Sequence, residues 1–134
     1  MLLRLIPELG GDGTVCGIIA MNDTGSGLLN IFDAEMQHLG IYQGYAGWLG
    51  PVAIVGISGV AGIYPKIRVQ AQLVRDDNTP WSDWITENAI VKPAVPGVPR
   101  LSGSGIREAL YLANGPGNHV LAASTTKGGL ASLL

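Results

Sequence analysis

The chain is poor in cysteine and in charge, and it has no long apolar run. Cys16 is the one cysteine among 134 residues, which excludes an internal disulfide framework and a multi-cysteine zinc site. Charged residues make up 13% of the chain, and the net charge of −2 leaves no basic patch for nucleic acid. No segment approaches the roughly 20 consecutive apolar residues of a membrane-spanning helix. The first residues also lack a signal-peptide pattern, so we expect a cytoplasmic protein without nucleic-acid or membrane partners.

Glycine and apolar residues are abundant instead. The chain contains 20 glycines and its hydrophobic fraction is 47%, a composition that is typical of a turn-rich globular protein. A length of 134 residues predicts a single domain that spans residues 1–134. The small number of charges also fits a chain that covers part of its apolar surface in an oligomer.

Several segments have the pattern of β-strands. Residues 3–5, ahead of Pro7, predict a short edge strand, and the apolar run 14–21 predicts one buried strand. Apolar and polar residues alternate from 66 to 73, which indicates a half-buried antiparallel strand. Shorter strands are predicted at 52–55, 89–91 and 120–123.

Two short helices are predicted between the strands. The first begins at Asn30 or Asp33 and runs through Leu39. The second covers residues 106–113, where apolar residues have helical spacing and a Gly-Pro pair follows. Arg107 on this helix is expected to form a structural ion pair or hydrogen bond. The chain is therefore predicted to be mainly β, with a short C-terminal helix.

The most informative motif is Asp23-Thr24-Gly25-Ser26, which occurs once and follows the apolar run almost directly. Aspartic peptidases present a catalytic carboxylate in this way, and their chemistry needs two carboxylates that share one proton. The chain contains no internal repeat and no second copy of the motif. If the motif is catalytic, the active enzyme must be a homodimer to which each protomer contributes Asp23.

Other interpretations of these segments remain open. The motif on its own is also typical of a solvated turn whose Asp bonds to its own backbone. Residues 56–62 fit an ordinary hairpin, but not a phosphate-binding loop, because they lack lysine and no helix follows. Ser26 and Ser104 lack the Gly-x-Ser-x-Gly context of a serine hydrolase. His38 and His119 are far apart and are expected on the surface, so no metal and no cofactor are predicted.

Taken in order, these segments resemble a retropepsin, the single-domain aspartic protease of retroviruses and retrotransposons. An apolar strand runs into the Asp-Thr-Gly-Ser motif, and a short element ends in Leu39-Gly40-Ile41. A glycine-rich hairpin precedes the alternating strand, and Leu101-Ser102-Gly103-Ser104-Gly105-Ile106-Arg107 opens the last helix. The resemblance covers roughly residues 3–123. It implies the acid-protease fold, a closed β-barrel with one lobe per chain.

The resemblance implies roles for individual residues. Asp23 is the catalytic carboxylate, supported by its neighbours Thr24, Gly25 and Ser26. Thr24 makes hydroxyl hydrogen bonds across the dimer beneath the two carboxylates. Gly25 lets the substrate backbone approach closely, which a Cβ would obstruct. Gly103 packs behind the catalytic loop.

A flap is implied in residues 55–62, which would close over a peptide and pair with it by strand addition. Its substrate-binding residues are Ile57, Ser58, Gly59 and Val60. The implied function is an aspartic endopeptidase that cleaves extended polypeptide, such as its own polyprotein. Two carboxylates that share one proton favour activity at mildly acid pH.

Three features depart from the family pattern. Asn22 stands where the family carries an apolar residue, and Ser102 stands where a second apolar residue is typical. The segment 76–100 is longer than in a minimal retroviral enzyme and contains Trp81 and Trp84. The second interpretation is therefore a catalytically weak or inactive dimerisation or peptide-binding module with the same fold.

Overall fold

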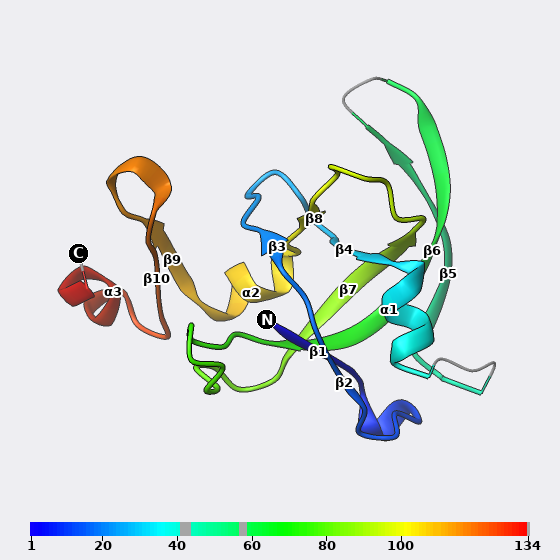
Figure 1. Ribbon diagram of the computed structural model, residues 1–134, viewed down its shortest axis with the longest axis horizontal. Coiled ribbons are helices and arrows are strands. Elements are labelled where there is room, and N and C mark those ends of the chain that lie inside the picture. The colour runs from blue at the N-terminus through cyan, green and yellow to red at the C-terminus, as the bar shows by residue number, and fades with distance from the viewer. Residues whose placement is uncertain (41–43, 57–58, 134) are drawn as a thin grey trace.

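Figure 1 shows the computed structural model of the chain, which describes residues 1–40, 44–56 and 59–133. These residues are mainly β, with ten strands, three short α-helices and 3-10 turns at Pro7–Leu9 and Pro116–Asn118. The helices are α1 (Asp33–His38), α2 (Ser104–Ala109) and α3 (Lys127–Leu133). The strands are β1 (Leu2–Leu5), β2 (Val15–Gly17), β3 (Ala20–Met21), β4 (Leu29–Phe32), β5 (Trp48–Val55), β6 (Ala61–Gln72), β7 (Ile85–Lys92), β8 (Arg100–Leu101), β9 (Tyr111–Asn114) and β10 (Leu121–Ser124).

The principal sheet has six strands, in the order β2-β1-β6-β7-β4, and β5 also pairs with β6. The long strand β6 joins the others, because β5 and β1 pair with successive parts of it and β7 pairs with its second half, residues 66–71. The alternation predicted here is confirmed. Ile67, Val69 and Ala71 are fully buried at 0% exposure, whereas Arg68 between them is exposed.

The core collects apolar side chains from most of the principal sheet and from α1. Helix α1 contributes Met36 and is followed by Leu39, and both side chains are buried, as the sequence predicts. Cys16 is buried in the same cluster and acts as a small apolar residue. The core cluster consists of Leu3, Leu5, Cys16, Ile18, Leu29, Ile31, Met36, Leu39, Tyr45, Ile67, Val69, Ala71 and Ala89.

Two parallel strand pairs position the site. In the principal sheet, β4 runs parallel to β7, with Leu29 opposite Ala89 and Phe32 opposite Lys92. In a separate two-stranded sheet, β3 runs parallel to β8. The Asp23 loop connects β3 to β4 and therefore joins these two pairs. Parallel neighbours come from distant parts of the chain, so this arrangement depends on long-range contacts.

The predicted closed barrel is not found in the part of the chain that the structure describes. The path of the principal sheet ends at β2 and at β4, and these two strands do not pair with each other. The remaining strands form two separate pairs, β3 with β8 and β9 with β10. The sheet is therefore open, because its terminal strands have no partner that would close the ring of hydrogen bonds.

The N-terminal strands also differ from their prediction. The apolar run 14–21 is not one buried strand but two short ones, since β2 pairs with β1 and β3 pairs with β8. At the change of partner, Ile19 is 86% exposed. The predicted edge strand β1 lies between β2 and β6. An apolar run does not reveal where a chain leaves one sheet for another.

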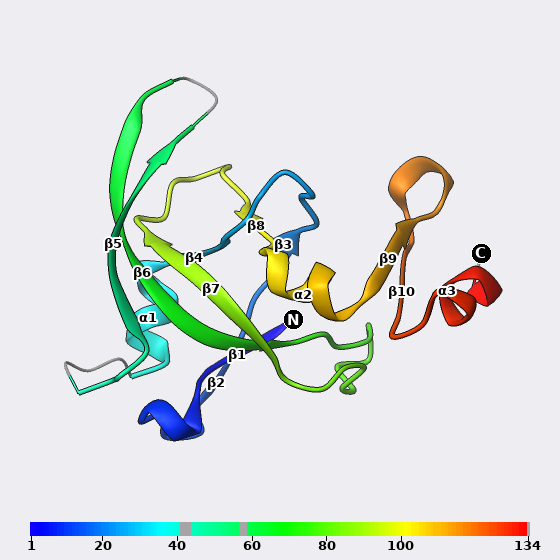
Figure 2. The same cartoon turned by 180° about the vertical axis from the view of Figure 1, so that it is seen from behind.

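The C-terminal quarter is the part that the sequence predicted least well. Helix α2 ends at Ala109 instead of 113, because the next residues form β9 and pair with β10. Helix α3 was not predicted. Ahead of this quarter, the strand expected at 89–91 is longer than predicted and begins at Ile85. Figure 2 shows the β9–β10 hairpin and α3 extending away from the principal sheet as an arm.

Among the described residues, none of the helices has the length and apolar character that crossing a membrane requires.

Candidate active site

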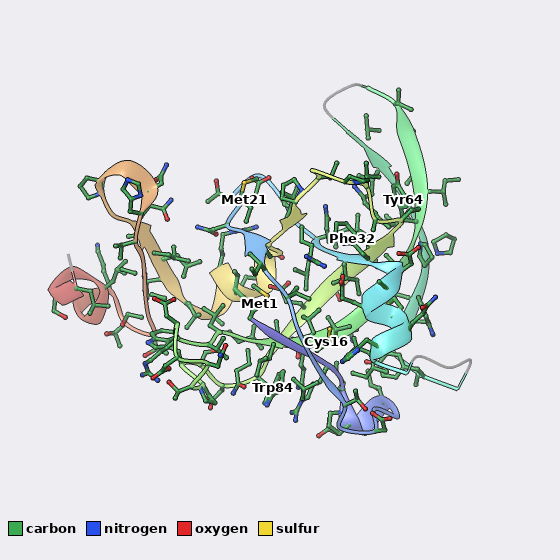
Figure 3. The ribbon with its side chains drawn as sticks, in the orientation of Figure 1. Met1, Cys16, Met21, Phe32, Tyr64 and Trp84 are labelled. Atoms are coloured by element: carbon green, nitrogen blue, oxygen red, sulfur yellow. The ribbon has the colours of Figure 1, made fainter. Side chains whose placement is uncertain are left out.

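The Asp23 loop begins where β3 ends. Figure 3 labels Met21, the last residue of β3, beside this loop. The Asp23 side chain is partly exposed and accepts a hydrogen bond of 2.8 Å from the Gly25 N–H. The Ser26 N–H donates to the Asp23 carbonyl at 3.2 Å, and Thr24 and Gly25 are exposed. The carboxylate is therefore held by its own turn and remains accessible.

Ser102 continues the pairing of β3 with β8 up to the motif. Its N–H donates to the Met21 carbonyl at 2.9 Å. Its Oγ accepts a hydrogen bond of 3.0 Å from the Asp23 N–H. Ser102 is 1% exposed, so the main chain of Asp23 is tied to a buried group 79 positions away in sequence.

Arg107 on α2 binds both Ser102 and the Asp23 loop. Its guanidinium donates to Ser102 Oγ at 3.1 Å and also to the Ser26 carbonyl. The Ser104 N–H donates to the Gly27 carbonyl at 3.2 Å. Arg107 is thus a hydrogen-bonding residue, as expected, and the turn before α2 contacts both ends of the Asp23 loop.

Glu87 lies behind this turn and was not singled out from the sequence. Its carboxylate accepts the Gly105 N–H at 3.1 Å and the Ile106 N–H at 2.8 Å, which are among the free donors at the start of α2. A Cβ on Gly103 would lie 2.8 Å from the Leu29 nitrogen and would collide with the Glu87 carboxylate. Position 103 therefore has no room for a side chain between Glu87 and the start of β4.

The pKa of Glu87 is raised above its usual value. Burial is the main cause and outweighs the hydrogen bonds from Ile106 and Gly105 and the attraction of Arg107. A carboxyl whose folded-state pKa is raised binds its proton more tightly in the folded chain. Its contribution to stability is present below the usual value of 4.5 and is lost as the pH rises through the folded-state pKa.

Glu87→Gln is expected to reduce this loss of stability with rising pH. Glutamine has no charge to bury, so the free energy of unfolding should change less between pH 4.5 and neutral pH than in the wild type. Urea denaturation at a fixed protein concentration measures the difference. Glu8→Gln is the control, because Glu8 is exposed and is not among the groups that shift the pKa of Glu87. An unchanged pH dependence in Glu87→Gln would contradict the assignment.

Glu35 and Arg100 form a second buried contact beside the loop. The Arg100 guanidinium donates to both carboxylate oxygens of Glu35, at 2.6 and 3.0 Å. Glu35 also accepts the Phe32 N–H at 2.6 Å, and the guanidinium lies 4.5 Å from the centre of the Phe32 ring. This contact anchors β8 to the start of α1. Burial alone raises the pKa of Glu35, but the bonds from Arg100 and Phe32 outweigh it and hold the pKa below its usual value.

Arg100→Lys is expected to lower the free energy of unfolding by about 1–2 kcal/mol. A lysine keeps the charge but cannot donate two parallel hydrogen bonds to Glu35 or stack on the ring of Phe32. Chemical denaturation at neutral pH measures the loss. Arg75→Lys serves as the control, since Arg75 is exposed and the change there should stay within about 0.5 kcal/mol. Equal effects at the two positions would contradict a special role for Arg100.

The predicted flap corresponds to the hairpin of β5 and β6. The last strand pair is Val55 with Ala61, and Gly59 has a positive φ of 75° in the turn. Val60 and Ile63 are 72% and 75% exposed. Ile57 and Ser58 lie outside the described residues. In both views the hairpin and the Asp23 loop rise toward the same side of the molecule (Figures 1 and 2).

Asn22 is half-buried and stands just before the motif. Its Oδ1 is buried and has no hydrogen-bond partner among the described residues. His38 and His119 are exposed, as expected. The described residues contain no group of histidine, cysteine or carboxylate side chains that would hold a metal ion.

An open cavity of about 840 Å³ among the described residues lies elsewhere. Its lining residues include Trp81, Trp84, Leu110 and Ser124. None of its lining residues belongs to the Asp23 loop or to the flap. Trp81 and Trp84, in the segment 76–100, are therefore separate from the candidate active site.

Sequence reasoning found some of these residues and missed others. It singled out Asp23, Gly103 and Arg107, and it noticed Ser102 only as a departure from a pattern. Glu87 was missed, although a carboxylate at an apolar position of a strand is itself a signal of a buried polar contact. Comparison with protein families, with curated proteins and with solved structures finds no significant match to this chain.

Proposed function

We propose that this chain is a retropepsin-like aspartic endopeptidase whose active site contains Asp23 from two identical copies. The observation that supports it best is the anchoring of the Asp23 loop by a turn about 80 positions later in sequence. A solvated turn needs no such support, since its own hydrogen bonds suffice. Here the motif is tied to a buried serine and an arginine, while the carboxylate itself stays accessible.

The chemistry follows from two carboxylates placed face to face. At a separation of about 3 Å they cannot both be ionised at low cost, so they share one proton. The ionised carboxylate takes a proton from a water molecule, which attacks the scissile carbonyl. The protonated one donates a hydrogen bond to that carbonyl and later helps to protonate the leaving amine. The pair titrates as one unit.

A second copy of the chain is required, because each copy carries one motif. The C-terminal arm offers apolar surface for this contact. Four large apolar side chains on the arm are exposed, and a monomer gains nothing from leaving them in water. They are Tyr111, Val120, Leu121 and Leu133.

The proposed substrate is an extended polypeptide. The β5–β6 hairpin carries exposed apolar side chains, including Val55, Val60 and Ile63, close to its turn. A strand of this kind binds an extended peptide through main-chain hydrogen bonds and apolar contacts. Closing over the peptide would also exclude bulk water from the two carboxylates.

The test is incubation of the purified protein with a mixed peptide library from about pH 4 to about pH 7, followed by mass spectrometry. The expected result is internal cleavage that is fastest at mildly acid pH. Sedimentation in the same buffers should report a dimer. A protein that stays monomeric at high concentration would contradict the proposal, because a single Asp23 has no partner.

A catalytically weak or inactive peptide-binding dimer is the second candidate. The buried, unpartnered Oδ1 of Asn22 favours it, because this residue precedes the carboxylate directly and carries a polar group where the family has an apolar one. In that case the library assay would show retained peptides without cleavage products, and sedimentation would still report a dimer.

A further inference from the structure

We propose that Ser102 is a positioning residue for Asp23, acting through its hydroxyl oxygen together with Arg107. This inference rests on the proposed function, but it concerns a feature in which the chain departs from the retropepsin pattern. Where an apolar side chain would only fill space, the serine makes hydrogen bonds.

The Ser102 hydroxyl receives two hydrogen bonds at once. The Asp23 N–H donates to Oγ at 3.0 Å, and the Arg107 guanidinium donates to the same oxygen at 3.1 Å. A hydroxyl oxygen has two lone pairs, so both bonds can form together. A charged donor also strengthens its bond to the oxygen. An apolar residue at 102 would leave the Asp23 N–H without its acceptor.

Arg107 connects Ser102 to the other end of the motif. The guanidinium that donates to Ser102 also donates to the Ser26 carbonyl. The first and last residues of the motif are thus connected through one arginine and one serine, both on or next to α2. Helix α2 is fixed in turn, because Glu87 accepts the N–H groups of Gly105 and Ile106.

The position of the Asp23 main chain decides where its carboxylate points. The side chain has only two rotatable bonds, and one oxygen is already engaged by Gly25. In a shared-proton pair, the two carboxylates must meet within hydrogen-bond distance. A displacement of about 1 Å in such a pair costs about a hundredfold in rate. Ser102 therefore controls the turnover step more than substrate binding.

The test compares three substitutions at position 102 in the full-length chain. Ser102→Ala removes the oxygen and is expected to lower kcat by about tenfold to a hundredfold, with KM changed by less than about twofold. Ser102→Thr keeps the hydroxyl and should retain activity within about threefold. Ser102→Cys is a further variant for the case that Ser102→Ala does not fold. Its thiol is a weak acceptor of similar size, so its kcat should lie between those of Ser102→Ala and Ser102→Thr. Ser104→Ala is the matched control on the same turn.

A second measurement does not depend on cleavage. Amide hydrogen exchange of Asp23 should become about tenfold faster in Ser102→Ala, whereas the Ser104 amide, which donates to Gly27, should keep its rate. The proposal would be overturned if exchange became equally faster at the Asp23 and Ser104 amides. It would also be overturned if kcat of Ser102→Ala fell only in proportion to the fraction of folded protein. Full activity in Ser102→Ala would overturn it as well. If the wild type cleaves no peptide, the proposed function fails, and the exchange rates still decide whether Ser102 holds Asp23.

Discussion

Asp23→Asn is expected to abolish peptide cleavage, lowering kcat by at least about a thousandfold. A pair of asparagines has no shared proton, so it can neither take a proton from water nor protonate the leaving amine. The Gly25 N–H, which bonds to Asp23 Oδ1 in the wild type, can still bond to the amide oxygen of the substituted side chain, so the loop should keep its shape. The fold and the dimer should therefore persist while turnover is lost.

Cleavage rates with one defined peptide at mildly acid pH measure this effect. The control is Asp76→Asn, which removes a carboxylate from an exposed turn and should leave the rate unchanged. Sedimentation of both variants establishes that loss of activity is not loss of assembly. Residual cleavage at the wild-type rate would remove Asp23 from the mechanism.

Mixed dimers make this prediction specific for a shared site. When equal amounts of wild-type and Asp23→Asn protein exchange subunits, about one quarter of the dimers carry two Asp23 side chains. The activity should then fall to about one quarter of that of the same total amount of wild-type protein. A fall to only one half would mean that each copy acts alone.

Gly103→Ala is expected to lower the free energy of unfolding by about 3 kcal/mol. The added methyl group would lie 2.8 Å from the Leu29 nitrogen and 2.9 Å from Glu87 Cδ. The first atom belongs to the backbone of β4 and the second to a buried side chain that is fixed by two hydrogen bonds. Neither can move aside without loss of packing. The cost comes from lack of space and not from the backbone, since φ at Gly103 is −93°.

Chemical denaturation at neutral pH and one protein concentration measures the loss. Gly27→Ala is the control from the same region, because a Cβ on Gly27 would meet no other atom within 4 Å. It should change stability by less than about 0.5 kcal/mol. A Gly103 variant as stable as the Gly27 variant would show that the turn before α2 is loosely packed.

Local patterns in the sequence predicted several elements correctly. The alternation from 66 to 73 predicted the buried face of β6, and Gly40 predicted a helix ending near Leu39. The first prediction succeeds because a strand with one buried face repeats its apolar residues at a fixed spacing. The predicted caps, Asn30 and Asp33, are wrong, because Phe32 is the residue before the helix. A strand end just before Asp23 was predicted from the apolar run that stops at Met21, and β3 ends there.

Predictions that depended on partners in other parts of the chain failed. The run 14–21 is apolar throughout, but it changes partner between β2 and β3. Residues 110–113 have helical spacing, yet pairing with β10 makes most of them a strand. Both outcomes depend on which other segment offers hydrogen bonds, and the spacing of apolar residues carries no information about that.

The sequence by itself determined that the chain is mainly β, that it carries one Asp-Thr-Gly-Ser motif and that any shared-carboxylate site needs a second copy. Only the tertiary structure decided what holds the motif. Ser102 and Arg107 contact it from about 80 positions away, and Glu87 fixes the helix that carries Arg107. The physical reason is that a buried polar group must find a partner, and in a parallel strand pair that partner comes from a distant part of the chain.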